Sequence, residues 1–376
     1  MFERIYSMLI KEFIHAFRDP RMRVLLLGVP ILQTMIFGFA VSTDVRDIRT
    51  FAYDADNSVY SRELVERLRG SGYFEIADYL ATEEEGSRLL DSGDAKAVFV
   101  IHPGFDATIR SGGSAPLQVL VDGTDSMSAG IVLSYTVKIA ASWGEAILVE
   151  RINRISGAKT ASQQVSLESR AWFNENLVSR NYFVPGVIAL LVMLITFMLS
   201  SMAIVREKEI GTIEQIIVSP ISQFEFIIGK TVPFAIIGFI DVVLISVVAM
   251  VVFDVPLRGN VALLMGSTGL YLMSTLGLGL LISTMSSTQQ QAMMTTFLFF
   301  FPAVLLSGFI FPIANMPEPV QWLTYVNPLR YFLIIVRGIF LKGIGFDVLW
   351  PQMAALLVLG SALLTAASLR FSKNIG

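Results

Sequence analysis

The sequence predicts an all-α membrane bundle of six spanning helices, with an N-terminal interfacial helix, an outer re-entrant hairpin and an inserted extracytoplasmic α/β domain. Composition favours a membrane protein: 54% of the 376 residues are hydrophobic, 16% are charged, and the mean hydropathy is +0.64. Several apolar runs reach the roughly 20 residues needed to cross a hydrocarbon core of about 30 Å. One long segment, residues 44–180, lacks a convincing run of this kind, which predicts the inserted domain.

Residues 1–19 are expected to form an amphipathic helix on the cytoplasmic membrane surface. Apolar side chains recur there at helical spacing: Ile5, Leu9, Phe13 and Phe17. The pair Asp19-Pro20 breaks this helix, although a direct extension of the first span is the alternative. Residues 22–43 contain the first span. They lack a small-residue cleavage site, so a retained anchor is predicted rather than a cleaved signal.

Residues 44–180 are predicted to fold as an α/β domain outside the membrane. Between residues 44 and 179 there are 20 acidic and 13 basic residues, a net charge of −7. Short β-rich runs at 50–53, 97–101 and 117–121 alternate with stretches of helical spacing at 60–69 and 83–90. This alternation favours a small, largely parallel sheet. A long helix over 126–156 is expected to lead back to the membrane as a stalk.

Five further spans are predicted after the inserted domain, at 184–205, 231–253, 263–284, 292–311 and 350–369. The loop at 206–230 contains Arg206 and Lys208, and its positive charge assigns it to the cytoplasm. Basic residues likewise hold the tail at 370–376 inside, so both termini are expected in the cytoplasm. A single span then separates the cytoplasmic N-terminus from residues 44–180, which places that domain outside.

Residues 312–345 are expected to form a re-entrant or interfacial hairpin at the outer face. They contain several prolines, followed by an apolar helix of about a dozen residues that carries Arg330 and Arg337. Such a helix is too short and too charged to cross the membrane. Trp322, Tyr325 and Tyr331 suit the aromatic belt at a membrane interface.

Several classes of chemistry are excluded or disfavoured by residue content. The chain has no cysteine, which excludes disulfides, thiolate metal sites and cysteine nucleophiles. His15 and His102 are too far apart in sequence to suggest a histidine-rich metal site. The sequence contains no G-x-x-x-x-G-K-[ST] phosphate-binding loop, so ATP hydrolysis is not expected from this chain.

Five sequence segments together resemble the membrane subunit of a type 2 ATP-binding-cassette (ABC) exporter, in the bacterial branch with a large extracytoplasmic domain. They are REKEIGTIEQIIVSPISQFEFIIGK at 206–230, SSTQQQAMM at 286–294, LSGFIFPIANMPEPVQWLTYVNPLRYF at 306–332, VIHPGFDATIRSG at 100–112 and LQVLVDGT at 117–124. Their order and spacing cover nearly the whole chain.

The resemblance implies that residues 206–230 form a coupling segment, a short helix resting in a groove of a separate ABC ATPase subunit. The residues that match the family pattern are Glu207, Glu209, Gly211, Thr212, Glu214 and Pro220. Glycine at 211 permits a turn, and Thr212 could cap a helix together with Gln215. The charged side chains would give polar contacts and orientation to the docked surface.

The resemblance also implies the partners and the location of the protein. ATP and magnesium would be bound by the partner ATPase, with no cofactor in this chain. A second permease would complete a homodimer or heterodimer, and the involvement of a periplasmic adaptor and outer-membrane channel stays open. The protein would be multi-pass in the bacterial inner (cytoplasmic) membrane, surrounded by lipid, and no nucleic-acid partner is expected.

The leading functional hypothesis is export of an amphipathic drug- or lipid-like substrate, driven by ATP hydrolysis in the separate subunit. The alternative is a polytopic membrane enzyme acting on lipid at the outer face, although no Ser/His/Asp set supports it. An ion-coupled transporter would need acidic residues within spans, and Asp241 is the only obvious one. The candidate substrate path comprises Asp241, Ser274 and Ser307.

Overall fold

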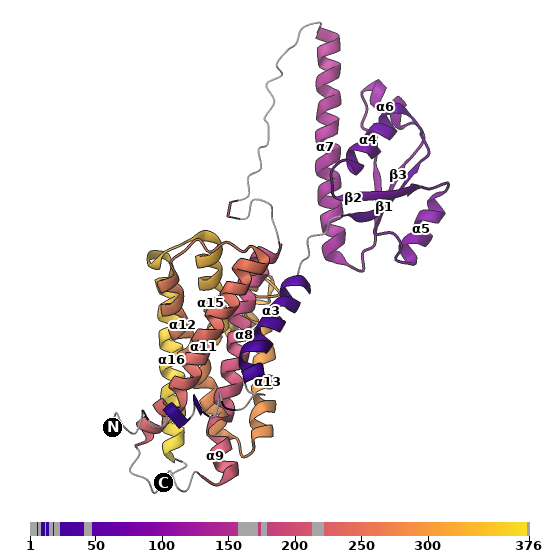
Figure 1. The fold of residues 1–376 in the computed structure, drawn as a ribbon. Coiled ribbons are helices and arrows are strands. Elements are labelled where there is room, and N and C mark those ends of the chain that lie inside the picture. The colour runs from indigo at the N-terminus through magenta and orange to yellow at the C-terminus, as the bar shows by residue number, and fades with distance from the viewer. Residues whose placement is uncertain are drawn as a thin grey trace. The chain divides into compact units, whose positions relative to one another are not determined.

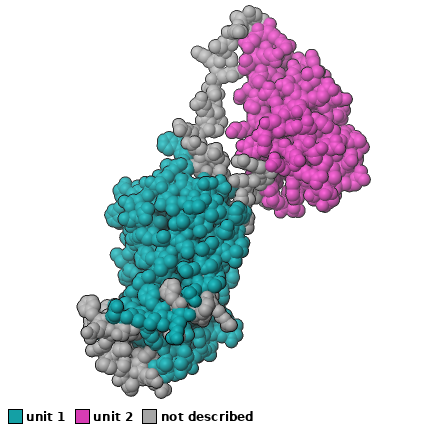
Figure 2. Space-filling model, viewed as in Figure 1, with its two compact units in different colours: residues 1–43, 170–376 teal, residues 44–169 magenta. Residues whose placement is uncertain are grey.

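A computed structural model describes residues 23–40, 47–156, 172–173, 179–212 and 222–373, together with residues 6, 9–11, 13–14 and 18 of the N-terminal segment. The chain divides into two compact units, shown in different colours in Figure 2. Unit 1 comprises Met1–Thr43 and Arg170–Gly376, and unit 2 comprises Asp44–Ser169. The prediction of a mostly helical chain with membrane-length apolar helices and a small sheet is confirmed.

Unit 1 is a bundle of helices (Figure 1). These are η1 (Val24–Gly28), α3 (Val29–Ala40), α8 (Ser179–Ala203), α9 (Val205–Ile210), α11 (Gln223–Phe253), α12 (Val261–Met285), α13 (Gln289–Leu305) and α16 (Phe346–Lys373). Shorter elements lie between α13 and α16: η2 (Ile313–Asn315), α14 (Glu318–Leu323), η3 (Thr324–Val326), α15 (Pro328–Arg337) and η4 (Gly338–Lys342).

Helix α8 is the centre of the bundle. It contacts α3, α11, α12, α13 and α15, and its residues 184–193 are all buried. A helix that is apolar on every side suits such a position, because neighbours cover it all round. The Tyr271 hydroxyl of α12 donates a hydrogen bond to the carbonyl of Ala189, at 3.0 Å.

Glycines let α12 approach its neighbours closely. A Cβ atom added at Gly279 would lie 1.8 Å from the hydroxyl oxygen of Ser200 on α8. One added at Gly277 would lie 3.0 Å from the backbone nitrogen of Leu364 on α16. These small residues therefore serve helix packing, which depends on close backbone approach in a membrane bundle.

The segment predicted as an outer hairpin folds back into the bundle. Gly308, with φ of +82°, follows α13 and permits the left-handed turn there. Helix α15 buries Leu329, Phe332 and Val336, and the ring of Phe332 stacks on Tyr271 at 4.1 Å. The amphipathic α15 is thus held by side-chain packing against α8, α12 and α16.

Unit 2 is built on a four-stranded sheet with the order β2-β1-β3-β4. Its strands are β1 (Ile48–Asp54), β2 (Phe74–Tyr79), β3 (Ala97–Ile101) and β4 (Gln118–Val121), and its helices are α4 (Val59–Arg69), α5 (Glu83–Asp91), α6 (Phe105–Ser111) and α7 (Ser126–Ser156). Strand β1 runs parallel to β2 and β3, whereas β4 is antiparallel to β3. The sequence analysis missed β2.

The side chains of the central strand β3 divide the core of unit 2 into two layers. Phe99 and its same-face neighbours pack with α4, α6 and α7, while Val98 and Val100 pack against α5. Helix α7 is long and apolar enough over Ser128–Arg154 to cross a membrane by length and composition. It nevertheless contributes Val132 and Trp143 to this core, which explains why it belongs to the α/β unit.

Acidic residues stabilise turns and helix starts in unit 2. Asp56 accepts hydrogen bonds from the backbone N–H groups of Gly104, Phe105 and Asp106, at 2.8, 3.1 and 3.0 Å. The Ser58 hydroxyl and these backbone donors hold the pKa of Asp56 below its usual range. Asp122 accepts a hydrogen bond from the backbone N–H of Thr124, so it stabilises a turn.

Candidate coupling site

A break in the helix between α8 and α9 creates the site. Ile204 separates the two helices, and the hydroxyl oxygen of Ser283 accepts hydrogen bonds from the backbone N–H groups of Ile204 (2.9 Å) and Val205 (3.1 Å). Ser283 lies in the last turn of α12 and is fully buried. A side chain of α12 therefore satisfies backbone donors at the start of α9.

Glu207 of α9 is the centre of a buried ionic cluster. Its Oε1 atom lies 2.7 Å from the Lys230 ammonium of α11 and 3.2 Å from the Lys11 ammonium of the N-terminal segment. The Thr212 hydroxyl donates to its second oxygen. Glu207 and Lys230 are only 6% and 4% exposed. Glu207 thus connects α9, α11 and the N-terminal segment, so its carboxylate acts inside the bundle.

Two neighbouring charges join α9 to the turn between α12 and α13. The Lys208 ammonium donates to the carbonyl of Thr284 at the end of α12, at 3.1 Å. The Glu209 carboxylate accepts from the backbone N–H of Gln289, the first residue of α13, at 2.8 Å, and from the Gln289 side chain. A cation at a helix C-terminus and an anion at an N-terminus are each favourable, because they complement the helix dipole.

The end of α9 is exposed. Gly211 terminates it with φ of +81°, and Ile210 beside it is 62% exposed. Helix α11 then begins with a capping box in which Ser222 and Glu225 exchange side chain–backbone hydrogen bonds. Of the predicted coupling residues, Glu214 and Pro220 lie outside the described residues, as does the proposed cap partner Gln215.

The structure brings Glu207 and Thr212 into direct contact and places Glu209 on the adjacent exposed face. The sequence analysis missed the roles of Lys11, Ser283 and Gln289. A signal for Gln289 was present in the polar SSTQQQ turn, whereas nothing local in the sequence pairs Lys11 with a residue 196 positions away.

The three residues of the candidate substrate path occupy separate environments. Asp241, in the middle of α11, is fully buried, and both of its carboxylate oxygens are without a hydrogen-bond partner among the described residues. The Ser274 hydroxyl donates to the carbonyl of Leu356 on α16, at 3.2 Å. The Ser307 hydroxyl donates to the carbonyl of Val304, at 2.7 Å. The two serines therefore make intramolecular hydrogen bonds, whereas neither carboxylate oxygen of Asp241 has a partner among the described residues.

No group of three or more His, Asp or Glu residues suited to a metal ion is found in the described part of the chain.

Comparison with known proteins identifies the family. A family model described as "ABC-2 family transporter protein" matches residues 20–369. The probable multidrug ABC transporter permease YbhR of Escherichia coli is 31% identical over 375 residues, covering 100% of both chains. The probable multidrug ABC transporter permease YbhS of the same organism is 29% identical over 345 residues, which is 90% of this chain and 89% of YbhS.

The inner membrane transport permease YhhJ of Escherichia coli is 30% identical over 328 residues, covering 86% of this chain and 84% of YhhJ. All three relatives are named as permeases rather than as enzymes. The resemblance drawn from the sequence motifs is therefore confirmed, and this protein is a member of the ABC-2 family of transporters.

Proposed function

We propose that this chain is the membrane permease subunit of an ABC exporter that moves an amphipathic drug- or lipid-like substrate outward. The names of the relatives YbhR and YbhS, which include multidrug ABC transport, support the substrate class. The observation that carries the proposal is the buried network around α9. Ion pairs and hydrogen bonds join this short helix directly to α11, α12, α13 and the N-terminal segment. A helix that transmits movement from an ATPase to the bundle needs such connections.

The proposed coupling uses α9 as a rigid connection. A separate ATPase would contact the exposed face that carries Glu209 and Ile210. Displacement of that face would carry Glu207, and with it Lys230 at the start of α11, because breaking a buried ion pair is strongly unfavourable. The bonds from Lys208 and Glu209 would pass the same displacement to the ends of α12 and α13.

The ATPase, ATP and magnesium are proposed to reside in a partner chain, because this sequence lacks a phosphate-binding loop. A second permease, identical or homologous, would complete the pathway. We further propose six spans in the bacterial inner membrane, with both termini and α9 in the cytoplasm and unit 2 outside. The positive charge of the segments flanking the spans supports this orientation.

Asp241 is proposed to face the substrate. An ionised carboxylate within a bundle needs a partner, and none of the described residues supplies one. A cationic group on an amphipathic substrate would supply that partner during transport. Ser274 and Ser307 would border the same path only if their present hydrogen bonds opened.

The experiment that tests the proposed function is reconstitution with and without the partner ABC ATPase. The purified chain alone is expected to hydrolyse no ATP, while vesicles holding both proteins are expected to transport a cationic amphipathic dye with ATP. Hydrolysis by the rigorously purified chain, or transport that is independent of the ATPase, would contradict the proposal.

A further inference from the structure

Unit 2 contains a cavity that the coupling mechanism does not use. Its volume is about 330 Å³, at the lower end of the range of about 300–1,000 Å³ for small-molecule sites. One face of α7 forms a wall with Ala140, Trp143, Ile147 and Arg151, which follow one another at helical spacing. The other walls are Phe105 and Ile109 of α6, Leu64 of α4 and the loop from Gly112 to Leu117.

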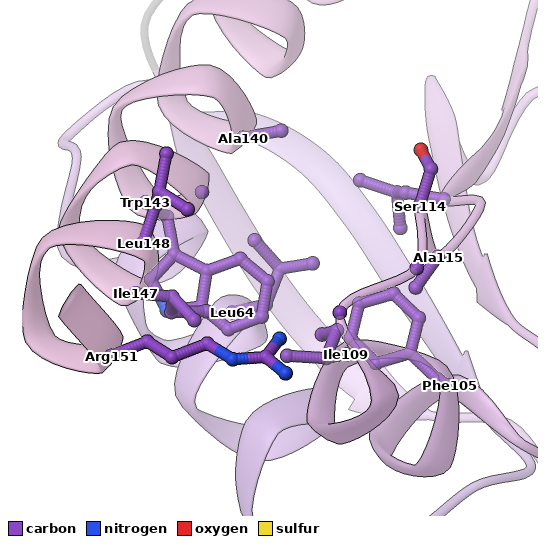
Figure 3. Close-up of a pocket in the computed structure, with 14 residues that line it drawn as sticks. Leu64, Phe105, Ile109, Ser114, Ala115, Ala140, Trp143, Ile147, Leu148 and Arg151 are labelled. Carbon is purple, nitrogen blue, oxygen red and sulfur yellow. The ribbon is translucent and has the colours of Figure 1, made fainter. Parts of the chain in front are cut away.

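Most of the side chains that line this cavity are aliphatic or aromatic. The rings of Phe105 and Trp143 are nearly parallel, with an interplanar angle of 3° and centroids 6.1 Å apart. The Ser114 hydroxyl is among the few polar groups of the lining (Figure 3). An apolar cavity with a few polar groups at its edge is the usual form of a site for an amphiphilic small molecule.

The guanidinium of Arg151 lies across this cavity. Figure 3 shows it extending from α7 toward Ile109, beside Trp143. It also approaches the facing loop, since a Cβ atom added at Gly112 would lie 2.5 Å from its Nη1 atom. The Arg151 side chain forms no hydrogen bond or ion pair with any described residue, although a guanidinium offers five N–H donors.

Among the described residues Arg151 has no counter-ion, which distinguishes it from the other arginines near it. Arg110 pairs with Asp106 at 2.6 Å, and Arg154 pairs with Glu150 at 2.5 Å. Both neighbouring carboxylates are thus already engaged, in a unit whose sequence is acidic overall. The site therefore combines apolar side chains with one guanidinium whose N–H donors have no partner among the described residues. Such a site is complementary to a molecule with an anionic head group and an apolar body.

We propose that this cavity binds a small amphiphilic anion, with its carboxylate or similar acidic group on Arg151 and its apolar part against Phe105 and Trp143. The proposal goes beyond the coupling site and does not depend on it, since every lining residue belongs to unit 2. Binding can therefore be measured without the ATPase, and failure here would leave the proposed transport function untouched.

The test uses octanoate as the probe and Trp143 as the reporter. The other tryptophans, Trp172, Trp322 and Trp350, are 76%, 69% and 55% exposed, so their replacement by phenylalanine in the full-length protein should preserve the fold. Octanoate is expected to change the Trp143 emission saturably, whereas octylammonium, with the same chain and opposite charge, should not. No saturable response to octanoate, or an equal response to both probes, would overturn the proposal.

Two variants identify the residues that bind. Arg151→Gln is expected to weaken octanoate binding about tenfold or more, because a charge-assisted hydrogen bond is lost. The matched control Arg67→Gln removes an arginine of α4 that pairs with Glu63 outside the cavity, and it should retain wild-type affinity. Ala140→Leu should block binding by filling the cavity. Equal affinities for Arg151→Gln and Arg67→Gln would overturn the assignment of the head-group site.

Discussion

Replacing Glu207 with glutamine is expected to destabilise the bundle by about 3–5 kcal/mol, the usual effect of removing one partner of a buried ion pair. The change keeps the size of the side chain and removes its charge. The Lys230 side chain is only 5% exposed and would lose the carboxylate that lies 2.7 Å from its ammonium. The Lys11 side chain is 54% exposed, so it can return to water and should contribute little to the loss.

A double variant separates the ion pair from general damage to packing. Glu207→Gln combined with Lys230→Met removes both charges, so the buried ammonium that Glu207→Gln alone would leave without this carboxylate is also gone. Apolar replacement of a buried pair is often neutral or stabilising. The double variant is therefore expected to recover most of the stability lost in Glu207→Gln.

The free energy of unfolding would be measured by titrating the protein with SDS in mixed micelles. Glu66→Gln is the matched control, because Glu66 pairs with Arg69 at 2.8 Å while the two side chains are 58% and 44% exposed. Its effect should stay below about 1 kcal/mol. A loss in Glu207→Gln no larger than in the control, or a double variant as unstable as the sum of the single variants, would refute the reasoning.

Three further predictions concern separate residues. Glu209→Lys should lower co-purification of the ATPase several-fold, because it reverses a charge on the proposed docking face and at the start of α13; wild-type recovery of the ATPase would contradict this. Asp241→Asn should not lower stability, because it removes a buried charge that has no described partner, yet it should slow transport of a cationic dye relative to a neutral one. Equal rates for both dyes would argue against a substrate contact. Asp56→Asn should destabilise unit 2 at pH 7. Folding lowers the pKa of Asp56, so the ionised carboxylate adds to the free energy of unfolding above the unfolded pKa of about 3.9, and this contribution is lost as the pH falls through the folded pKa. A difference in unfolding free energy between variant and wild type that stays constant from pH 7 to pH 3 would contradict this.

The membrane helices were the most predictable part of the fold. Long apolar runs are a local property, and the run 263–284 corresponds closely to α12 at Val261–Met285. Helix α11 begins at Gln223, well before residue 231, where the apolar run was expected to start. Glu225 and Lys230 made that stretch look like part of a loop, but both are buried, and Lys230 pairs with Glu207. A charged residue in the sequence indicates an exposed position only when the fold supplies no opposite charge to pair with it.

The sheet of unit 2 shows a similar limit. The uniformly apolar β3 is buried on both faces and was easy to recognise. Strand β2, with the sequence FEIADY, buries only Phe74 and Ile76 and was missed. Its place at the edge of the sheet beside β1 is a tertiary property that its own residues signal weakly.

The sequence indicated which segment forms the candidate site, but it did not indicate which contacts the residues of that segment make. The sequence pointed to residues 206–230, but the contacts of Glu207 with Lys11 and of Glu209 with Gln289 join residues 196 and 80 positions apart. Only the folded bundle brings these groups together. The cavity at Arg151 was likewise not apparent, because it is made by four separate parts of unit 2.

Cross-linking from a single cysteine at Ile210 tests the proposed coupling most directly. The native chain has no cysteine, and Ile210 is 62% exposed at the end of α9. A photoreactive maleimide on Ile210→Cys is expected to cross-link to the ATPase in the assembled complex, whereas the same reagent on Ser87→Cys, on the exposed face of α5 in unit 2, should not. An intact complex in which position 210 gives no adduct, or no more than position 87, would contradict docking of the ATPase on α9.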